Sequence, residues 1–322
     1  NTKWSWLAEI KSIPDFKCIS PKQINMMISS KNNGFGHALY LQIPRIKQPI
    51  PLFIVFRALG IISDKEICKK IALDITTSKK STQILYGLKA SIIDANSYDT
   101  QEKSIEYIVN IVMFTPINMD PETGRRKKRE FALDVLNNDL YPHCITKVQK
   151  IYFLGLMANK LLQTSFGWRK VDDRDSYINK RLDLAGSLLN NLFRNYFNKL
   201  VKDMQKQTIR EINNGSWKSQ DDYLNIINQT NVYKIIKSTT IENGIKRALA
   251  TGDFGIKNTN SNKVGVAQVL NRLTYISSLS HLRRINTPID KSGKLIPPRK
   301  LHNTQWGFIC PAETPEGQSV GV

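Results

Sequence analysis

The sequence lacks the features of a secreted, disulfide-bonded or membrane-spanning protein. Its 322 residues include four cysteines, and none lies in a CxxC pair or near a histidine at zinc-finger spacing: Cys18, Cys68, Cys144 and Cys310. Such dispersed thiols are typical of a reducing compartment and argue against a zinc site. No run of about 18 apolar residues is present, so we expect no transmembrane helix and no membrane partner. The first residues, NTKWSWLAEI, resemble neither a signal peptide nor a start at methionine, so we expect the chain to be a piece of a longer protein.

Motifs that build an active site within one chain are also lacking. No P-loop, GxSxG or HExxH pattern occurs. The spacing of Glu313 and Glu316 would bring them together on a helix, but the prolines between and before them exclude a regular helix, and no third metal ligand is near. Residues 314–317 fit a β-turn instead, and we expect His302 to be hydrogen-bonded within the fold rather than to act as a base. The sequence therefore predicts no catalytic residue and no metal site.

What the sequence has in excess is positive charge. It contains 47 Lys and Arg residues against 27 Asp and Glu, a formal net charge of +20. A surplus of this size is typical of proteins that contact polyanions such as nucleic acid or anionic lipid. An amphipathic membrane helix would concentrate the charge in one segment, whereas here it is spread along the chain, which favours an extended nucleic-acid track. A basic protein with a solvated surface is the alternative.

Hydrophobic periodicity and turn residues predict the main elements. Residues 50–60 (IPLFIVFRALG), bounded by a proline and a glycine, favour a strand that runs into a turn. Ser63 with Glu66 three residues later predicts a helix start with a capping box. The clearest helix, 182–212, has an apolar stripe expected to face a core and lysines on its back. Further elements are expected as a strand or short helix at 1–15 and helices at 66–75, 102–113, 130–140 and 268–282.

A block of five cations, RRKKR, occupies residues 125–129. Like charges repel one another, so such a block is typical of a solvated loop. A nuclear-import signal is the functional alternative. The solvated loop is the simpler interpretation, because short basic runs are common on charged proteins.

A second basic cluster lies between residues 272 and 300, where Asp290 is the single acid. Its cations are Arg272, Arg283, Arg284, Lys291, Lys294, Arg299 and Lys300. Neighbouring arginines diverge by about 100° on a helix, so one can reach a phosphate while the other packs elsewhere, and a guanidinium can bind a phosphate through two parallel hydrogen bonds. The prolines and central glycine of the following loop suit a wedge that is held at its base and mobile at its tip. An ordinary solvated loop is the alternative.

The same region carries specific motifs. LSHLRR, the basic loop, LHNTQWG and CPAETPEGQ follow one another between Gly265 and Val322. In this order they resemble the fork of the second-largest subunit of cellular and viral multisubunit DNA-dependent RNA polymerases. Upstream segments are similar to the eukaryote-like branch of that family, so the resemblance covers nearly the whole chain: Lys47–Ile61, Leu140–His143, Tyr152–Leu162, Asp172–Gly186 and Leu249–Gly255.

The resemblance implies a multi-domain α+β architecture with a helix-rich lobe and mixed α/β protrusion and fork regions. Residues 1–15 and 181–250 would belong to the protrusion, 16–180 to the lobe and 251–322 to the fork. Lys257 and Lys263 would lie in a first fork loop beside the RNA–DNA hybrid, and 286–298 in a second one near the point where downstream DNA separates. Positions matching residues that line the hybrid are Gln268, Arg283, Arg284, Arg299, Pro315 and Glu316. With the basic cluster, the expected nucleic-acid contacts are Lys257, Lys263, Gln268, Arg272, Arg283, Arg284, Lys291, Lys294, Arg299, Lys300, Pro315 and Glu316.

The resemblance also implies nucleotidyl transfer by two Mg²⁺ ions, held mainly by the largest subunit, with Zn²⁺ expected only in a C-terminal part beyond Val322. This piece would contact template DNA and the RNA transcript, assemble with the largest and smaller polymerase subunits, and be inactive alone. Its location would be the nucleus for a cellular enzyme, or the host cytoplasm or virion for a large DNA virus. A stand-alone basic nucleic-acid-binding protein and a structural adaptor are the alternatives.

Overall fold

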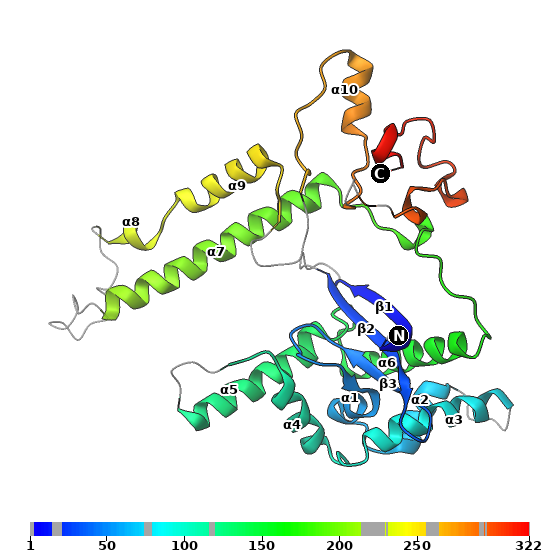
Figure 1. Ribbon diagram of the computed structural model, residues 1–322. Coiled ribbons are helices and arrows are strands. Elements are labelled where there is room, and N and C mark those ends of the chain that lie inside the picture. The colour runs from blue at the N-terminus through cyan, green and yellow to red at the C-terminus, as the bar shows by residue number, and fades with distance from the viewer. Residues whose placement is uncertain are drawn as a thin grey trace. The chain divides into compact units, whose positions relative to one another are not determined.

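The computed structural model describes residues 3–14, 21–73, 79–115, 120–213, 229, 231–255, 264–289, 293 and 295–321 (Figure 1). Contacts divide the chain into two compact units, residues 1–172 (unit 1) and residues 173–322 (unit 2). Each unit is built around its own hydrophobic cluster. Among the helices of the described ranges, none combines the length and the apolarity needed to cross a membrane.

Unit 1 contains a four-stranded antiparallel sheet in the order β1-β2-β3-β4 (Figure 1). Its strands are β1 (Trp4–Ser12), β2 (Lys22–Asn32), β3 (His37–Gln42) and β4 (Ile50–Pro51). Ile24, Met26 and Ile28 point to one face of β2 and are buried, and Met27 on the opposite face is buried as well. β1 confirms the extended alternative predicted for residues 1–15, and it pairs along β2.

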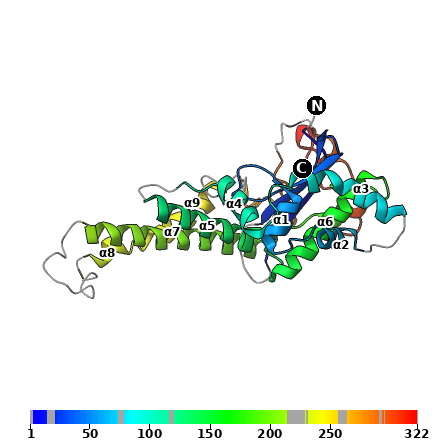
Figure 2. The ribbon, with the colours of Figure 1, turned by 90° about the horizontal axis from the view of Figure 1, so that it is seen from below.

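Helices pack around this sheet and complete the core of unit 1 (Figure 2). They are α1 (Leu52–Leu59), α2 (Asp64–Ala72), α3 (Lys79–Asp94), α4 (Gln101–Ile111), α5 (Pro121–Asp134), the π-helix η1 (Val135–Asp139) and α6 (Lys147–Ser165). α2 and α6 lie side by side (Figures 1 and 2). Gly155 allows this close approach, because a Cβ there would lie 2.4 Å from the carbonyl oxygen of Lys70. The helices predicted at 66–75, 102–113 and 130–140 are confirmed, with shifted ends.

The strand predicted within residues 50–60 is wrong, because Leu52–Leu59 form the helix α1. All eight residues of α1 are buried, so its apolar run has no polar face from which a helical period could be recognised. The two flanking residues act as helix ends: Pro51 precedes the first turn, and Gly60 adopts φ = 112° and donates its N–H to the carbonyl of Arg57.

Two predictions about helix starts also need correction. α2 begins directly after Ser63 as predicted, but the Ser63 side chain makes no capping hydrogen bond, so the capping box does not form. The basic block at 125–129 lies on α5 and not in a loop. Asp120 caps this helix by accepting a hydrogen bond from the Thr123 N–H at 2.9 Å, and Pro121 occupies its first turn. These start signals outweigh the repulsion among the cations.

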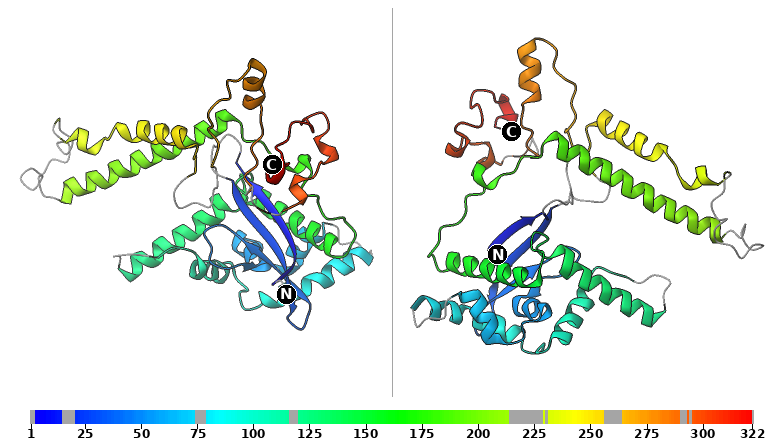
Figure 3. Two further views of the ribbon diagram at one scale, coloured as in Figure 1. Left: turned by 45° about the horizontal axis from the view of Figure 1, so that its top comes forward. Right: turned by 180° about the vertical axis from the view of Figure 1, so that it is seen from behind.

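The described residues of unit 2 form helices and loops but no strand, so the mixed α/β character predicted for the fork is not seen there. The elements are α7 (Ala185–Asn213), α8 (Val232–Ile235), α9 (Thr239–Thr251), α10 (Tyr275–Leu282) and the 3₁₀ turns η2 (Tyr177–Asn179), η4 (Pro297–Arg299), η5 (Asn303–Gln305) and η6 (Gly317–Ser319). α9 runs beside α7 (Figure 3). Gly244 is required at their crossing, because a Cβ there would lie 2.3 Å from the ring of Tyr196.

α7 confirms the long helix predicted at 182–212, but its apolar stripe is only partly covered. Leu192 is buried against Ala248 and Phe254, whereas Phe193 and Phe197 each remain 48% exposed. Across both units the described residues combine helices with one antiparallel sheet, which confirms the α+β prediction. The division into protrusion, lobe and fork stays a prediction.

Candidate nucleic-acid interface

The short helix α10 is the framework of the candidate interface. Thr274 begins the helix with a capping box: its side chain accepts from the Ser277 N–H at 3.1 Å, and the Ser277 hydroxyl accepts from the Thr274 N–H at 2.9 Å. Residues 268–273 are not helical, so the helix is shorter than the predicted segment 268–282. Its end is fixed by the N–H of Arg283, which contacts the carbonyl oxygens of Leu279 and Ser280 at 3.2 Å.

Three arginines flank α10 with exposed side chains. Arg272 precedes the helix, and Arg283 and Arg284 directly follow its last turn. In the described part of the chain, no carboxylate forms an ion pair with any of the three. Arg283 and Arg284 are also favoured at their position, because the carboxyl end of a helix carries partial negative charge. The three guanidinium groups are therefore available for an external anion.

Gln268 connects the preceding loop to α10. Its Nε2 donates to the carbonyl of Gly265 at 3.0 Å, and its Oε1 lies 3.0 Å from Nε2 of His281. The other ring nitrogen of His281 accepts the N–H of Asn271 at 3.1 Å. Because Nδ1 accepts, Nε2 carries the proton and donates to Gln268. Gln268 thus orients the loop that leads to Arg272, and sequence reasoning missed His281 as its partner.

Arg299 has mainly internal contacts. Its guanidinium donates to the carbonyl oxygens of Gln318 at 2.5 Å, Val320 at 3.2 Å and Gly293 at 3.1 Å. The backbone oxygen of Arg299 lies 2.3 Å from the position that a Cβ at residue 321 would occupy, so this close approach requires Gly321. The side chain therefore holds the end of the chain against η4. Lys300, the next residue, is exposed.

The segment after Phe308 contains no regular helix in its described residues, as the prolines predicted. The turn predicted at 314–317 is displaced: the 3₁₀ turn η6 starts only at Gly317, which adopts φ = 68°. Pro315 and Glu316 lie just before it with exposed side chains. Glu313 accepts a short hydrogen bond from the hydroxyl of Ser280 on α10. This contact gives Glu313 a structural role and ties the segment to α10.

His302 is hydrogen-bonded within the fold, as predicted. Its Nε2 lies 2.7 Å from a carboxylate oxygen of Asp173, and its Nδ1 lies 2.6 Å from the hydroxyl of Thr304. That hydroxyl accepts the N–H of Tyr177 at 2.9 Å. Hydrogen bonds from the backbone N–H of Asp175 and from His302 hold the pKa of Asp173 below its usual value. The group fastens η5 to the start of unit 2.

The predicted contacts therefore fall into four groups. Arg272, Arg283 and Arg284 are exposed around α10, while Gln268 and Arg299 make internal hydrogen bonds. Lys300, Pro315 and Glu316 are exposed on the connected segments. Four predicted lysines lie outside the described residues: Lys257, Lys263, Lys291 and Lys294. Among the described residues, no group of three His, Cys, Asp or Glu side chains could hold a metal ion.

Family models match two parts of the chain. The model described as RNA polymerase Rpb2, domain 2, matches residues 19–183, and the model described as RNA polymerase Rpb2, domain 3, matches residues 268–322. The second match contains α10 and all three of its flanking arginines.

Curated relatives match almost the full length of the chain. The DNA-directed RNA polymerase II subunit 2 of Arabidopsis thaliana is 38% identical over 99% of this chain and 26% of its own length. The RNA polymerase II subunit RPB2 of Schizosaccharomyces pombe is 38% identical over 99% of this chain and 25% of its own length. The DNA-directed RNA polymerase subunit 2 of Acanthamoeba polyphaga mimivirus is 33% identical over 97% of this chain and 26% of its own length. The chain thus spans about a quarter of the length of these relatives.

Proposed function

Because this chain belongs to the Rpb2 family of RNA polymerase subunits, we propose that it is part of the second-largest subunit of a DNA-directed RNA polymerase and helps to hold nucleic acid during DNA-templated RNA synthesis. The similarity across 99% of the chain is the observation that carries this proposal. The stand-alone binding protein is less well supported, because the relatives are polymerase subunits along the whole match.

The contribution of this piece would be electrostatic positioning. Arg272, Arg283 and Arg284 have no ion-pair partner in the described ranges, and α10 is capped at its start. Such preset guanidinium groups bind phosphates of any sequence, as transcription of arbitrary templates requires. The internal bonds of Gln268 and Arg299 would keep the loops around α10 in place. The template, the transcript and the RNA–DNA hybrid are therefore the proposed ligands of this region.

The residues described in this chain do not fit a metal site. We propose that the bond-forming reaction takes place on the largest subunit and that this piece positions nucleic acid for it. The Mg²⁺ ions of the assembled enzyme would be held mainly by the largest subunit, which together with smaller subunits is the expected protein partner. The cellular relatives point to the nucleus, and the mimivirus relative to the location of a viral enzyme.

Charge reversal at α10 tests this proposal. Polymerase assembled with Arg283→Glu and Arg284→Glu in the full subunit should bind an RNA–DNA scaffold more weakly. The slope of log affinity against log salt concentration should become shallower by roughly 0.7–0.9 for each lost phosphate contact. The matched control is Lys199→Glu with Lys202→Glu on α7, which makes the same charge change at exposed positions of unit 2. The control should retain both the affinity and the slope. Equal scaffold binding and RNA synthesis by the α10 variant and the control would contradict the proposed role of these arginines.

A further inference from the structure

The basic block of unit 1 is presented on a helix and not on a loop. Its five cations occupy one and a half turns in the middle of α5. Gly124 and Ala132 are buried, so they define the face of α5 that packs against the unit. The side chains of Arg125, Arg126 and Lys127 are exposed, and Lys128 is half-buried.

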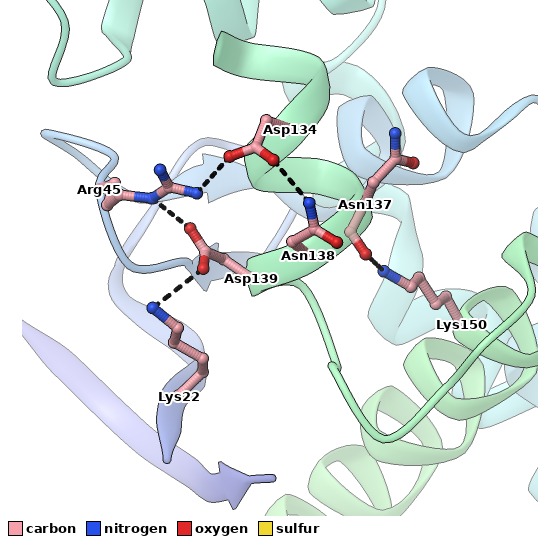
Figure 4. Close-up of polar contacts among 7 residues, drawn as sticks. All are labelled: Lys22, Arg45, Asp134, Asn137, Asn138, Asp139 and Lys150. Carbon is pink, nitrogen blue, oxygen red and sulfur yellow. Dashed lines mark hydrogen bonds and ion pairs between the residues drawn. The ribbon is translucent and has the colours of Figure 1, made fainter. Parts of the chain in front are cut away.

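A charged network fixes the carboxyl end of α5 to the sheet side of unit 1 (Figure 4). Arg45 donates to Asp134 on α5 at 2.7 Å and makes a short bond to Asp139 on η1. Asp139 is almost fully buried and also pairs with Lys22 of β2 at 3.1 Å. The guanidinium of Arg45 also lies over the ring of Phe131, 4.7 Å from its centroid.

Lys150 of α6 completes the support from the other side (Figure 4). Its buried ammonium donates to the carbonyl of Leu136 at 3.0 Å and makes a short bond to the carbonyl of Asn137. Burial lowers the pKa of Lys150, but the two carbonyls satisfy its charge. The helix that carries the basic block is therefore held by ion pairs and hydrogen bonds at its end and by the Asp120 cap at its start.

Among the described residues, most of the exposed cations of the block form no ion pair. Arg129 forms an ion pair with Glu102 of α4 at 2.7 Å. Within the described ranges, the other four cations form none. Glu122 and Glu130 are also exposed on α5, so among the described residues four cations without an ion pair share this helix with two such acids.

The chemistry of this surface fits the outside of a duplex better than a single strand or a protein. Proteins that bind single strands stack bases on exposed aromatic rings, but the one aromatic residue of α5, Phe131, is packed against Phe114 and Arg45. Protein interfaces depend on apolar or aromatic anchors, and Leu133, at 37% exposure, is the single large apolar side chain exposed on α5. The exposed groups that α5 does offer are cations, which bind phosphates and which the anchored helix holds in a preformed arrangement.

We propose that Arg125, Arg126, Lys127 and Lys128 form a contact for the phosphate backbone of double-stranded nucleic acid, separate from the arginines around α10. The proposal rests on the proposed function, because a polymerase on DNA supplies such a duplex. The helix α5 corrects the prediction of a solvated loop, and the nuclear-import signal stays the alternative for the same residues.

The test uses polymerase assembled with the full subunit carrying Arg125→Gln, Arg126→Gln and Lys127→Gln. Binding of a blunt DNA duplex is followed by fluorescence anisotropy over a range of salt concentrations. Loss of three phosphate contacts should reduce the slope of log affinity against log salt by about 2.7, since each contact contributes about 0.9. The matched control, Lys65→Gln with Lys79→Gln and Lys160→Gln, removes the same charge from separate exposed positions of unit 1 and should change the slope little.

Two further measurements make the result decisive. A charge-retaining variant, Arg125→Lys with Arg126→Lys, should keep most of the slope, which separates loss of phosphate contacts from damage to the fold. A slope for the glutamine variant equal to that of the wild type, or an equal loss in the dispersed control, overturns the proposal. Retained duplex binding with loss of an acidic protein partner overturns it as well. RNA extension by the wild type and the dispersed control tests the proposed function independently, because neither alters α5.

Discussion

The buried carboxylate of Asp139 should be one of the most sensitive single positions in unit 1. Its side chain is 3% exposed and contacts two cations, Lys22 and Arg45. Asp139→Asn keeps the shape of the side chain but removes its charge, which takes the carboxylate partner from Lys22 and leaves Arg45 with Asp134 as its remaining partner. The same substitution at Asp99 is the matched control, because Asp99 also pairs with a lysine, at 2.7 Å, but in full contact with solvent.

The expected magnitude follows from burial. Removing one partner of a buried ion pair costs about 3–5 kcal/mol. Lys22 and Arg45 are 29% and 36% exposed, so water can partly replace the carboxylate, and we expect a loss of about 2–3 kcal/mol in the free energy of unfolding. For a unit of this size that corresponds to a fall in melting temperature of about 4–12 °C. Asp99→Asn should leave the melting temperature almost unchanged.

Thermal and urea unfolding of the chain, followed by circular dichroism, measure this loss. A double-mutant cycle with Arg45→Met isolates the pairwise contribution, which should be about 1–2 kcal/mol for groups in direct contact. An Asp139→Asn protein as stable as the Asp99→Asn protein would refute the reasoning. It would mean that the network is solvated in solution and does not anchor η1.

Two further outcomes are expected. Gly155→Ala should destabilise unit 1 by about 1–3 kcal/mol in urea unfolding, because the new Cβ would lie 2.4 Å from the Lys70 carbonyl oxygen. The control is Gly186→Ala on α7, where nothing lies within 4 Å, and it should be neutral or slightly stabilising in the same assay. Equal effects of the two substitutions would contradict the close packing of α2 against α6. Hydrogen bonds from Arg45 and then Asn138 hold the pKa of Asp134 below its usual value of 3.8, against the opposing effect of burial. The stability that this carboxylate contributes is therefore full above pH about 4 and is lost as the pH falls through the lowered folded-state pKa. In Asp134→Asn the free energy of unfolding should therefore fall less steeply below pH 4 than in the wild type. An unchanged dependence on pH would argue against the Arg45 contact.

Local sequence signals predicted several elements because their causes are local. The apolar spacing between 182 and 212 was enough to predict α7. The start of α2 after Ser63 was predicted from the pattern of Ser63 and Glu66, and it is confirmed although the capping box itself does not form. In α5 the start signal, Asp120 followed by Pro121, is also local, but the prediction for residues 125–129 rested on the charge of the block alone.

Predictions failed where burial decided the structure. α1 was mistaken for a strand because all of its residues are buried, even Arg57, so no alternation of buried and exposed positions marks a helical period. The stripe on α7 was expected to be covered, yet Phe193 and Phe197 stay half-exposed. A sequence shows which side chains can be buried, but the amount of cover depends on what packs against them.

The sequence by itself determined the family, the basic character and the set of cations that could meet nucleic acid, because these properties depend on residue identity and order. Only the tertiary structure decided which of those cations are available. Arg299 is engaged by carbonyls near the end of the chain, while Arg283 and Arg284 are exposed without an ion pair in the described ranges. Asp139 acquires its two cations from residues about a hundred positions away. The charge of a side chain is fixed by its chemistry, but its partner is fixed by which distant segments the fold brings within hydrogen-bond distance.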